Sequence, residues 1–582
     1  MKNIKKIQNW IKKNNIDFFI LNRSDEFLNE YLAPYAERLN WVSNFTGSAG
    51  RLIILQNEAI IFTDGRYTTQ VKKQVDEKYF INKHINKYWN WLENHITKNT
   101  ITAVDTNLHS IFEINKLKNL IKSKKSTLEF LSKNPIDLFW KNQPGYPKTN
   151  AFFHIKKYSG KTVKQKINEL CLVLKKKSID YYFLNSLDSI AWLLNIRGKD
   201  IPYTPFVFCY AIISKNKRVN LFMNLKKTKL IKKYLQNYVD FFPLSHIQIF
   251  FDKFNKNLNI GMDIYRTNYY FKNLCDSHNI KIKYVDDPIY YFKSQKNKIE
   301  IKGAIKSNLR DGLSITKFIF WLKNKMIISK NNEISASKYL YNLRKKNYLY
   351  FSLSFETISA IGKNAALPHY RLTKESNLSF RKNTIYLVDS GAQYFDGTTD
   401  ITRTLVIGNP SKEQKDRFTR VLKGHIAIAT KEFNNTTTGS ELDPLARKSL
   451  YEIGCDYDHG TGHGIGSFSS VHEGPQRISK SNQSNNDYIK EGMILSNEPG
   501  FYKKDQYGIR IENLILVVKK SKKKLAFKTI SLAPIDIDLI DKKLLTKNEI
   551  RWVNDYHKKV RLSLGKFLKL KEKDWLKNVT RN

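Results

Sequence analysis

Residues 385–407 read IYLVDSGAQYFDGTTDITRTLVI, and this stretch sets the architecture of the second half of the chain. The apolar run from Ile385 predicts a strand that reaches Asp389 near its end. The turn Asp396-Gly397 then starts a return strand at Asp400. Because a hairpin lays its strands side by side, Asp389 and Asp400 are expected at one locus on one face. Two carboxylates that meet there repel each other unless a cation lies between them.

More residues of metal-binding type follow this hairpin. The segment His459-Gly-Thr-Gly-His463-Gly-Ile-Gly carries glycine at every second position, which predicts a loop whose backbone approaches another group closely. His472 comes next, and Glu498 stands directly before the forced turn Pro499-Gly500. The run Ile509-Arg510-Ile511-Glu512-Asn513 leads into an apolar strand, and alternation places Arg510 and Glu512 on one face.

Each of these residues alone has an ordinary structural explanation, such as a turn acid or a satisfied histidine. Jointly, four carboxylates and several histidines among apolar strands and glycines indicate a site for two divalent cations. Burying the carboxylates without such cations would cost several kcal/mol per ion. An oxygen-rich set with one imidazole suits Mn, Co, Fe or Zn rather than a thiolate zinc site. Thr402, two residues beyond Asp400, is expected to donate a supporting hydrogen bond.

The first half of the chain contains an internal duplication. IDFFILNRSDEF from Ile16 is echoed by IDYYFLNSLDSI from Ile179, and each follows a Lys-rich amphipathic segment. Helix, strand, turn and strand therefore recur in the same order, which predicts two related α/β domains. We place them at 1–147 and 148–292, joined at the turn-rich segment 143–147, with a third domain at 293–582 that includes a C-terminal extension from about 530.

Bulk composition limits the partners of the protein. The net charge is +47, but the excess is mostly lysine spread along the chain, so we expect no specific nucleic-acid partner. The apolar runs are shorter than the ~18 residues of a membrane span, and the N-terminus reads as an amphipathic helix rather than a signal peptide. The four scattered cysteines favour a cytoplasmic protein with free thiols. For Arg66, in the turn Thr63-Asp-Gly-Arg-Tyr67, contact with a substrate or subunit and a structural ion pair remain alternatives.

Several motifs together resemble one family. The stretches DSGAQYFDGTTDITRT, HGTGHGIG, VHEGP, NEPG and GIRIEN closely resemble aminopeptidase P (Xaa-Pro aminopeptidase), of the pita-bread metallopeptidases. NFTGSAG and TDGRY are similar to the first domain of that family, DSIAWLLNIRG to the second, and RDGLSITKFIFWL to the opening helix of the catalytic domain. The resemblance covers essentially the whole chain and includes the extension of the long, three-domain members. It implies two creatinase-N-like α/β domains followed by a pita-bread catalytic domain, and a homodimer.

The resemblance also implies residue roles. Asp389 would chelate one metal ion, and His463 and Glu498 the other, while Asp400 and Glu512 would bridge the pair. The expected ions are Mn²⁺, with Co²⁺ or Zn²⁺ as alternatives. Catalytic roles fall to His369, His472 and Glu498, with Glu498 as general base, and substrate binding falls to His369, His459, His472 and Arg510.

The activity that this resemblance implies is removal of the N-terminal residue from peptides with proline in second position. Prolidase, which cleaves Xaa-Pro dipeptides, is the nearest alternative, and a non-catalytic pita-bread binding protein is another. The duplicated N-terminal half argues against prolidase and against methionine aminopeptidase. Around His369 the chain reads GKNAALPHY where the family has a sequence close to GPNGAIIHY, so Lys363, Ala365 and Pro368 are expected to alter the pocket wall.

Overall fold

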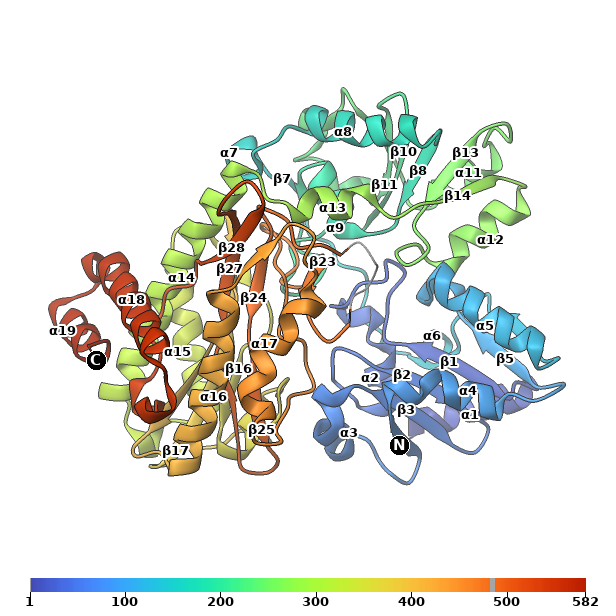
Figure 1. Ribbon diagram of the computed structural model, residues 1–582. Coiled ribbons are helices and arrows are strands. Elements are labelled where there is room, and N and C mark those ends of the chain that lie inside the picture. Colours follow the sequence, from blue (N-terminus) through green and yellow to red (C-terminus); the bar gives the residue numbers. More distant parts are fainter. Residues whose placement is uncertain (1, 482–486, 582) are drawn as a thin grey trace. The chain divides into compact units, whose positions relative to one another are not determined.

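The computed structural model describes residues 2–481 and 487–581, and this part of the chain forms two units (Figure 1). One unit comprises Met1–Ile155 and Lys161–Ile289, and the other comprises Lys156–Gly160 and Tyr290–Asn582. The first unit holds both repeats, and the second holds every residue expected to bind metal. The domain limits at 147 and 292 stay a prediction.

Both repeats have the same sheet topology, which confirms the internal duplication. β1 (Phe18–Asn22) pairs antiparallel with β2 and parallel with β5, and β8 (Tyr181–Leu184) pairs antiparallel with β10 and parallel with β13. The first sheet runs β4 (Phe80–His84), β3 (Ala59–Thr63), β2 (Arg51–Ile54), β1, β5 (Ile101–Val104) and β6 (Thr127–Phe130). The second runs β12 (Val239–Phe242), β11 (Val219–Met223), β10 (Cys209–Ser214), β8, β13 (Asn259–Met262) and β14 (Lys281–Tyr284).

Helices of the first unit bury apolar side chains in the cores of the two repeats. The opening helix α1 (Lys2–Lys13) is amphipathic as predicted, and Ile4, Ile7 and Ile11 are buried in the core of the first repeat. Arg66 forms an ion pair with Asp64 at 2.6 Å, so the structural alternative for this turn is present. The other helices here are α2 (Arg38–Ser43), α3 (Thr68–Gln74), α4 (Tyr88–His95), α5 (Ile111–Ser123), α6 (Pro135–Phe139), α8 (Val163–Lys176), α9 (Leu187–Leu193), α10 (Lys232–Leu235), α11 (His246–Asp252) and α12 (Tyr269–Ser277).

The second unit carries the predicted site on antiparallel strands. One sheet consists of β16 (Ile358–Ile361), β17 (Thr384–Ser390) and β20 (Ile401–Ile407). A larger sheet runs β21 (Glu432–Asn434), β28 (Lys524–Thr529), β27 (Asn513–Lys519), β24 (Ile494–Asn497), β22 (Gly462–Gly464) and β23 (Glu473–Ile478). Smaller sheets pair β15 (Tyr350–Leu353), β18 (Ala392–Tyr394) and β19 (Gly397–Thr398), and β25 (Gly500–Lys503) with β26 (Tyr507–Arg510). Its longer helices before the extension are α14 (Lys298–Asn324), α15 (Glu333–Lys345), α16 (Lys412–Ala429) and α17 (Gly439–Tyr451).

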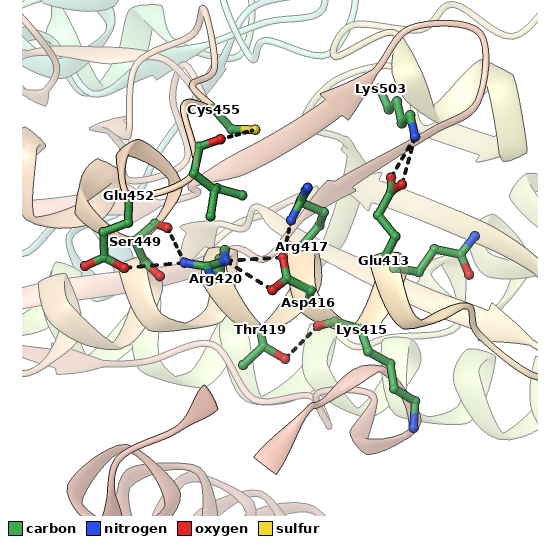
Figure 2. A network of polar contacts seen from close by, with 12 residues as sticks. Glu413, Lys415, Asp416, Arg417, Thr419, Arg420, Ser449, Glu452, Cys455 and Lys503 are labelled. Carbon is green, nitrogen blue, oxygen red and sulfur yellow. Dashed lines mark hydrogen bonds and ion pairs between the residues drawn. The ribbon is translucent and has the colours of Figure 1, made fainter. Parts of the chain in front are cut away.

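Helices α16 and α17 lie side by side (orange in Figure 1) and are tied together by polar contacts (Figure 2). Arg420 of α16 donates to the main-chain oxygen of Ser449 in α17 at 2.9 Å. At the start of α16, Glu413 accepts a hydrogen bond from Lys503 of β25 at 2.8 Å. The first contact joins α16 to α17, and the second joins α16 to β25, the strand that follows Glu498.

The C-terminal extension shares the core of the second unit. Its helices are α18 (Lys547–Leu564) and α19 (Leu570–Val579). Val553, Val560 and Leu564 of α18 are buried in one apolar cluster with Phe418 and Val421 of α16. The extension is therefore packed into the second unit by the same apolar burial that holds α16.

Two sequence expectations concern the chain as a whole. The four cysteines are free, as predicted. Within residues 2–481 and 487–581, no helix combines the length and apolarity needed to cross a membrane.

Replacing Gly424 by alanine is expected to destabilise the second unit. A Cβ at Gly424 would lie 2.1 Å from the main-chain oxygen of Ala446, so α16 and α17 would have to move apart. Overpacking costs about 1–3 kcal/mol, which exceeds the gain in helix propensity of about 1 kcal/mol. Thermal unfolding of the Gly424→Ala variant should therefore give a lower Tm. Gly565→Ala is the control, because its Cβ would meet its nearest neighbour at 4.0 Å. An equal Tm change in both variants would contradict the expected clash.

Candidate metal centre

The predicted hairpin is present and brings two aspartates to one place. β17 pairs antiparallel with β20, with Asp389 opposite Thr402, and the short strands β18 and β19 form the connection. Asp400 lies directly before β20. Asp389 is 7% exposed and Asp400 is 4% exposed, so both carboxylates are largely removed from bulk water.

Glu512 joins this pair through Thr402. Thr402 Oγ1 donates to Glu512 Oε2 at 2.7 Å, which is the supporting hydrogen bond that the sequence predicts. The prediction of one continuous strand through residues 509–513 is wrong, because β26 ends at Arg510 and β27 begins at Asn513. The break arises because β26 pairs with β25 whereas β27 pairs with β24 and β28. Between them the amide of Glu512 donates to the main-chain oxygen of Thr402 at 3.2 Å.

The glycine-rich segment supplies an imidazole. It is not entirely the predicted loop, since Gly462–Gly464 forms β22 in the larger sheet. The expected close backbone approach is present, because a Cβ at Gly462 would lie 2.1 Å from the main-chain oxygen of Ser496. His463 Nε2 lies 3.5 Å from Asp400 Oδ2 and 3.3 Å from Glu498 Oε1. Ser496 Oγ also donates to Glu498 Oε1, at 3.0 Å.

The donor set fits a bound cation. Ligand atoms of Asp400, His463 and Glu512 all lie within 4.8 Å of one another. Three buried carboxylate oxygens have no hydrogen-bond partner among the described residues: Asp389 Oδ1, Asp400 Oδ1 and Glu512 Oε1. An acceptor buried without a donor is costly, whereas a divalent cation would satisfy several such oxygens at once. The residues therefore suit the two metal ions that the sequence leads us to expect.

Burial and mutual repulsion disfavour the charged forms of these acids. Burial first, and then neighbouring carboxylates, raise the pKa values of Asp400 and Glu512 well above their usual range. Burial raises the pKa of Glu498 to about 7, although Arg510 opposes the shift. Such a cluster binds protons or cations in preference to carrying bare negative charge.

Arg510 is the cation that the chain itself places among the carboxylates. Its Nη2 donates to Asp389 Oδ2 at 2.7 Å, and its Nε donates to Thr402 Oγ1 at 3.2 Å. Its Nη1 donates to the hydroxyl of Tyr502 at 2.6 Å, and that hydroxyl lies 2.8 Å from His459 Nε2. Sequence reasoning missed Tyr502. Tyr502 reaches the site because it lies on β25, which pairs with the strand that ends at Arg510. This pairing is what would have pointed to Tyr502.

His472 lies against His463 and is followed by an anchored glutamate. The rings of His463 and His472 are 4.4 Å apart, edge to face. Glu473 is clamped between two buried lysines, with Lys293 Nζ at 3.2 Å and Lys296 in direct contact. This clamp fixes the backbone beside His472. No sequence pattern predicts this clamp, because both lysines precede α14 and lie far from Glu473 along the chain.

His369 follows the short turn η7 (Gly362–Ala366), which packs against β16, β17 and β26. It is half-buried. The contacts given above connect the five expected metal ligands with Arg510, Tyr502, His459 and His472. The catalytic role of His369 stays a prediction.

Comparison with known families covers nearly the whole chain. Residues 306–519 match the model of metallopeptidase family M24, and residues 523–582 match the C-terminal region of the M24 peptidases. Residues 3–132 and 142–300 each match the creatinase/prolidase N-terminal domain.

Similar proteins cover the chain from end to end. A protein of Coccidioides posadasii named probable Xaa-Pro aminopeptidase P is 35% identical over 598 residues, covering 99% of this chain and 98% of that relative. The solved X-prolyl aminopeptidase of Caenorhabditis elegans, described as a cytosolic enzyme with a di-nuclear active site, has a TM-score of 0.94 and 31% identity. It covers 100% of this chain and 99% of its own. Prolidase from Pyrococcus furiosus, at 24% identity and a TM-score of 0.52, covers 62% of this chain and 98% of its own, and shares the fold.

The metal-free protein is expected to lose stability as pH rises through the titration of Glu498. The folded-state pKa of about 7 lies above the usual 4.5, so the folded form binds the proton more tightly. That contribution is fully present below pH 4.5 and is lost as pH rises through 7. Tm values of metal-stripped wild type and Glu498→Gln should therefore agree near pH 4 and diverge toward pH 8, where the free energy of unfolding of the variant should be higher by about 1–3 kcal/mol. Glu93→Gln, at an exposed glutamate, is the control. Parallel curves of Tm against pH for wild type and Glu498→Gln would refute the expectation.

Proposed function

The chain belongs to metallopeptidase family M24, in its Xaa-Pro aminopeptidase P group, and from that premise we propose that it releases the N-terminal residue of peptides whose second residue is proline. One observation carries this proposal. Five residues of metal-binding type come together from strands and from the segments beside strand ends, and buried carboxylate oxygens of three of them have no hydrogen-bond partner among the described residues. In a cluster with a purely structural role, buried acceptors are normally paired with hydrogen-bond donors.

Asp389 would hold one metal ion and His463 with Glu498 the other, and Asp400 and Glu512 would contribute to both. The mutual proximity of Asp400, His463 and Glu512 supports the shared positions. Mn²⁺ is our first choice because the donors are mainly oxygens, and Co²⁺ and Zn²⁺ are the alternatives. When bound, two divalent ions supply Lewis acidity that lowers the pKa of water and polarises a carbonyl.

The residues of the chain supply proton transfer and orientation. Glu498 accepts the proton of the attacking water, a role open to a carboxylate held beside the metal-bound water. His369 stabilises the developing oxyanion, and His472 orients the substrate and carries a proton to the leaving nitrogen. Arg510 holds Asp389 in position through the 2.7 Å hydrogen bond, and Tyr502 links Arg510 to His459.

Proline in second position suits this chemistry because the prolyl nitrogen carries no N–H, so the site needs no acceptor there. The altered segment 362–370 bears on the same pocket. Its η7 turn packs on β17 and β26, the strands that carry Asp389 and Arg510. We therefore propose that Lys363, Ala365 and Pro368 tune substrate preference rather than the reaction.

Two alternatives differ in what they require. Prolidase needs the same ligands but acts on dipeptides, and the duplicated N-terminal unit of this chain favours longer substrates. A non-catalytic binding protein needs no metal ligands, whereas the five positions here hold competent residues. A homodimer and a cytoplasmic location complete the proposal, and the C. elegans relative is described as cytosolic.

Metal-stripped protein is expected to release arginine from Arg-Pro-Pro only after a divalent ion is added. Mn²⁺, Co²⁺ and Zn²⁺ should be compared, with free arginine measured by amino-acid analysis. The tripeptide should be cleaved faster than Arg-Pro. Faster cleavage of the dipeptide would favour prolidase, and no release with any of the three ions from folded protein would favour the binding protein.

Replacing Asp400 by asparagine is expected to remove metal binding and activity together. Changes to residues that merely support a ligand cost about 10–100-fold, so loss of a shared ligand should exceed that range. Bound Mn²⁺ can be measured by calorimetry and activity on Arg-Pro-Pro. Asp240→Asn is the control, because Asp240 pairs with Arg218 at the surface of the first unit. Full activity of Asp400→Asn would refute the ligand assignment.

A further inference from the structure

Arg403 is buried next to the proposed metal centre. It donates hydrogen bonds to acceptors that are far apart along the chain. It is 1% exposed. Its donors reach the strands that carry site residues and also the C-terminal extension. The acceptors are the main-chain oxygens of Thr402 (2.8 Å), Glu512 (2.7 Å), Pro534 (3.0 Å) and Ala533 (3.0 Å), Asn513 Oδ1 (2.8 Å) and the hydroxyl of Tyr556 (2.8 Å).

None of these acceptors is a carboxylate, so the hydrogen bonds described for Arg403 do not neutralise its charge. A buried charge of this kind is tolerated only where its donors are satisfied and an opposite charge lies near. Burial lowers the pKa of Arg403, and the hydroxyl of Tyr556 and the carboxylate of Glu512 oppose that shift. The guanidinium also donates to the main-chain oxygen of Glu512, so it lies directly beside a proposed metal ligand.

The same network continues to Glu498. Asn513 Nδ2 lies 3.1 Å from His425 Nε2, and His425 Nδ1 lies 3.0 Å from the main-chain oxygen of Asn497, the residue before Glu498. A carbonyl oxygen only accepts, so His425 carries its proton on Nδ1 and accepts from Asn513 through Nε2. Hydrogen bonds thus run without a break from α18 to the backbone beside Glu512 and Glu498.

Tyr556 is the member of this network that the extension contributes. Besides the bond from Arg403, its hydroxyl accepts from the amide of Ala533 at 3.2 Å. Its ring stacks on Trp552 with an interplanar angle of 1° and centroids 5.4 Å apart. The ring is therefore held by packing, while the hydroxyl alone reaches the guanidinium.

We propose that Tyr556 is a positioning residue through which the C-terminal extension preorganises the metal centre. Its hydroxyl holds Arg403, and Arg403 and Asn513 hold the backbone that carries Glu512 and Glu498. This inference rests on the metal centre proposed above. It assigns the extension a role in metal affinity in addition to its contribution to the core.

The test measures Mn²⁺ binding to metal-stripped, full-length protein by calorimetry. Tyr556→Phe keeps the ring and removes the hydroxyl, so Arg403 and Ala533 each lose an acceptor. We expect Mn²⁺ affinity to fall about ten-fold and activity on Arg-Pro-Pro to return toward the wild-type value at saturating Mn²⁺. Val560→Ala is the matched control, because Val560 is fully buried on α18 and contributes packing alone. Its Tm should fall while its Mn²⁺ affinity stays that of wild type.

Wild-type Mn²⁺ affinity in Tyr556→Phe would overturn the proposal. Equal weakening in Tyr556→Phe and Val560→Ala would also overturn it, because packing alone would then explain the loss. Glu512→Ala distinguishes a failure of the proposed metal centre from a failure of the proposed role of Tyr556. If wild type binds Mn²⁺ no better than Glu512→Ala, the metal centre itself is refuted, whereas tight binding by wild type alone leaves the role of Tyr556 to be decided by the first comparison.

Discussion

Repulsion between like charges is the constraint on which the second unit depends. Asp389, Asp400, Glu498 and Glu512 meet where little water reaches, and the chain places Arg510 among them and Arg403 behind them. Two guanidiniums do not balance four carboxylates, so the remaining negative charge calls for bound cations or bound protons. Two observations reflect this lack of positive charge. Three carboxylate oxygens have no donor among the described residues, and the raised pKa values of Asp400 and Glu512 favour their protonated forms.

The backbone, more than the side chains, brings these groups together. Glu512 lies where the chain leaves the sheet of β26 and enters that of β27, and this break turns its amide toward β20. Gly462 permits β22 to approach Ser496 more closely than any residue with a Cβ would allow, which places His463 between Asp400 and Glu498. Substitutions remote from the carboxylates are therefore able to disturb the centre whenever they shift these strands.

Sequence reasoning succeeded where the signal was local. The hairpin from Ile385 to Ile407 and the duplicated sheets follow from apolar periodicity and turn residues, and both are present. It failed at the break between Arg510 and Asn513, since strand pairing there is decided by partners elsewhere in the chain. For the same reason it missed the lysine clamp on Glu473 and the hydrogen bond from Arg403 to Tyr556. The roles of individual site residues came from the family resemblance, because spacing alone does not distinguish a ligand from a base.

The docking of α18 has a consequence for biosynthesis. Ribosomes deliver a chain from its N-terminus, and domains fold as units in that order. α18 follows β27, so every strand that carries a proposed site residue emerges before Tyr556 does. A nascent chain thus contains all five expected ligands while the hydrogen-bond shell of Arg403 is still incomplete. Tight retention of metal would then begin with the arrival of the extension, which makes cofactor loading a late event in the maturation of this protein.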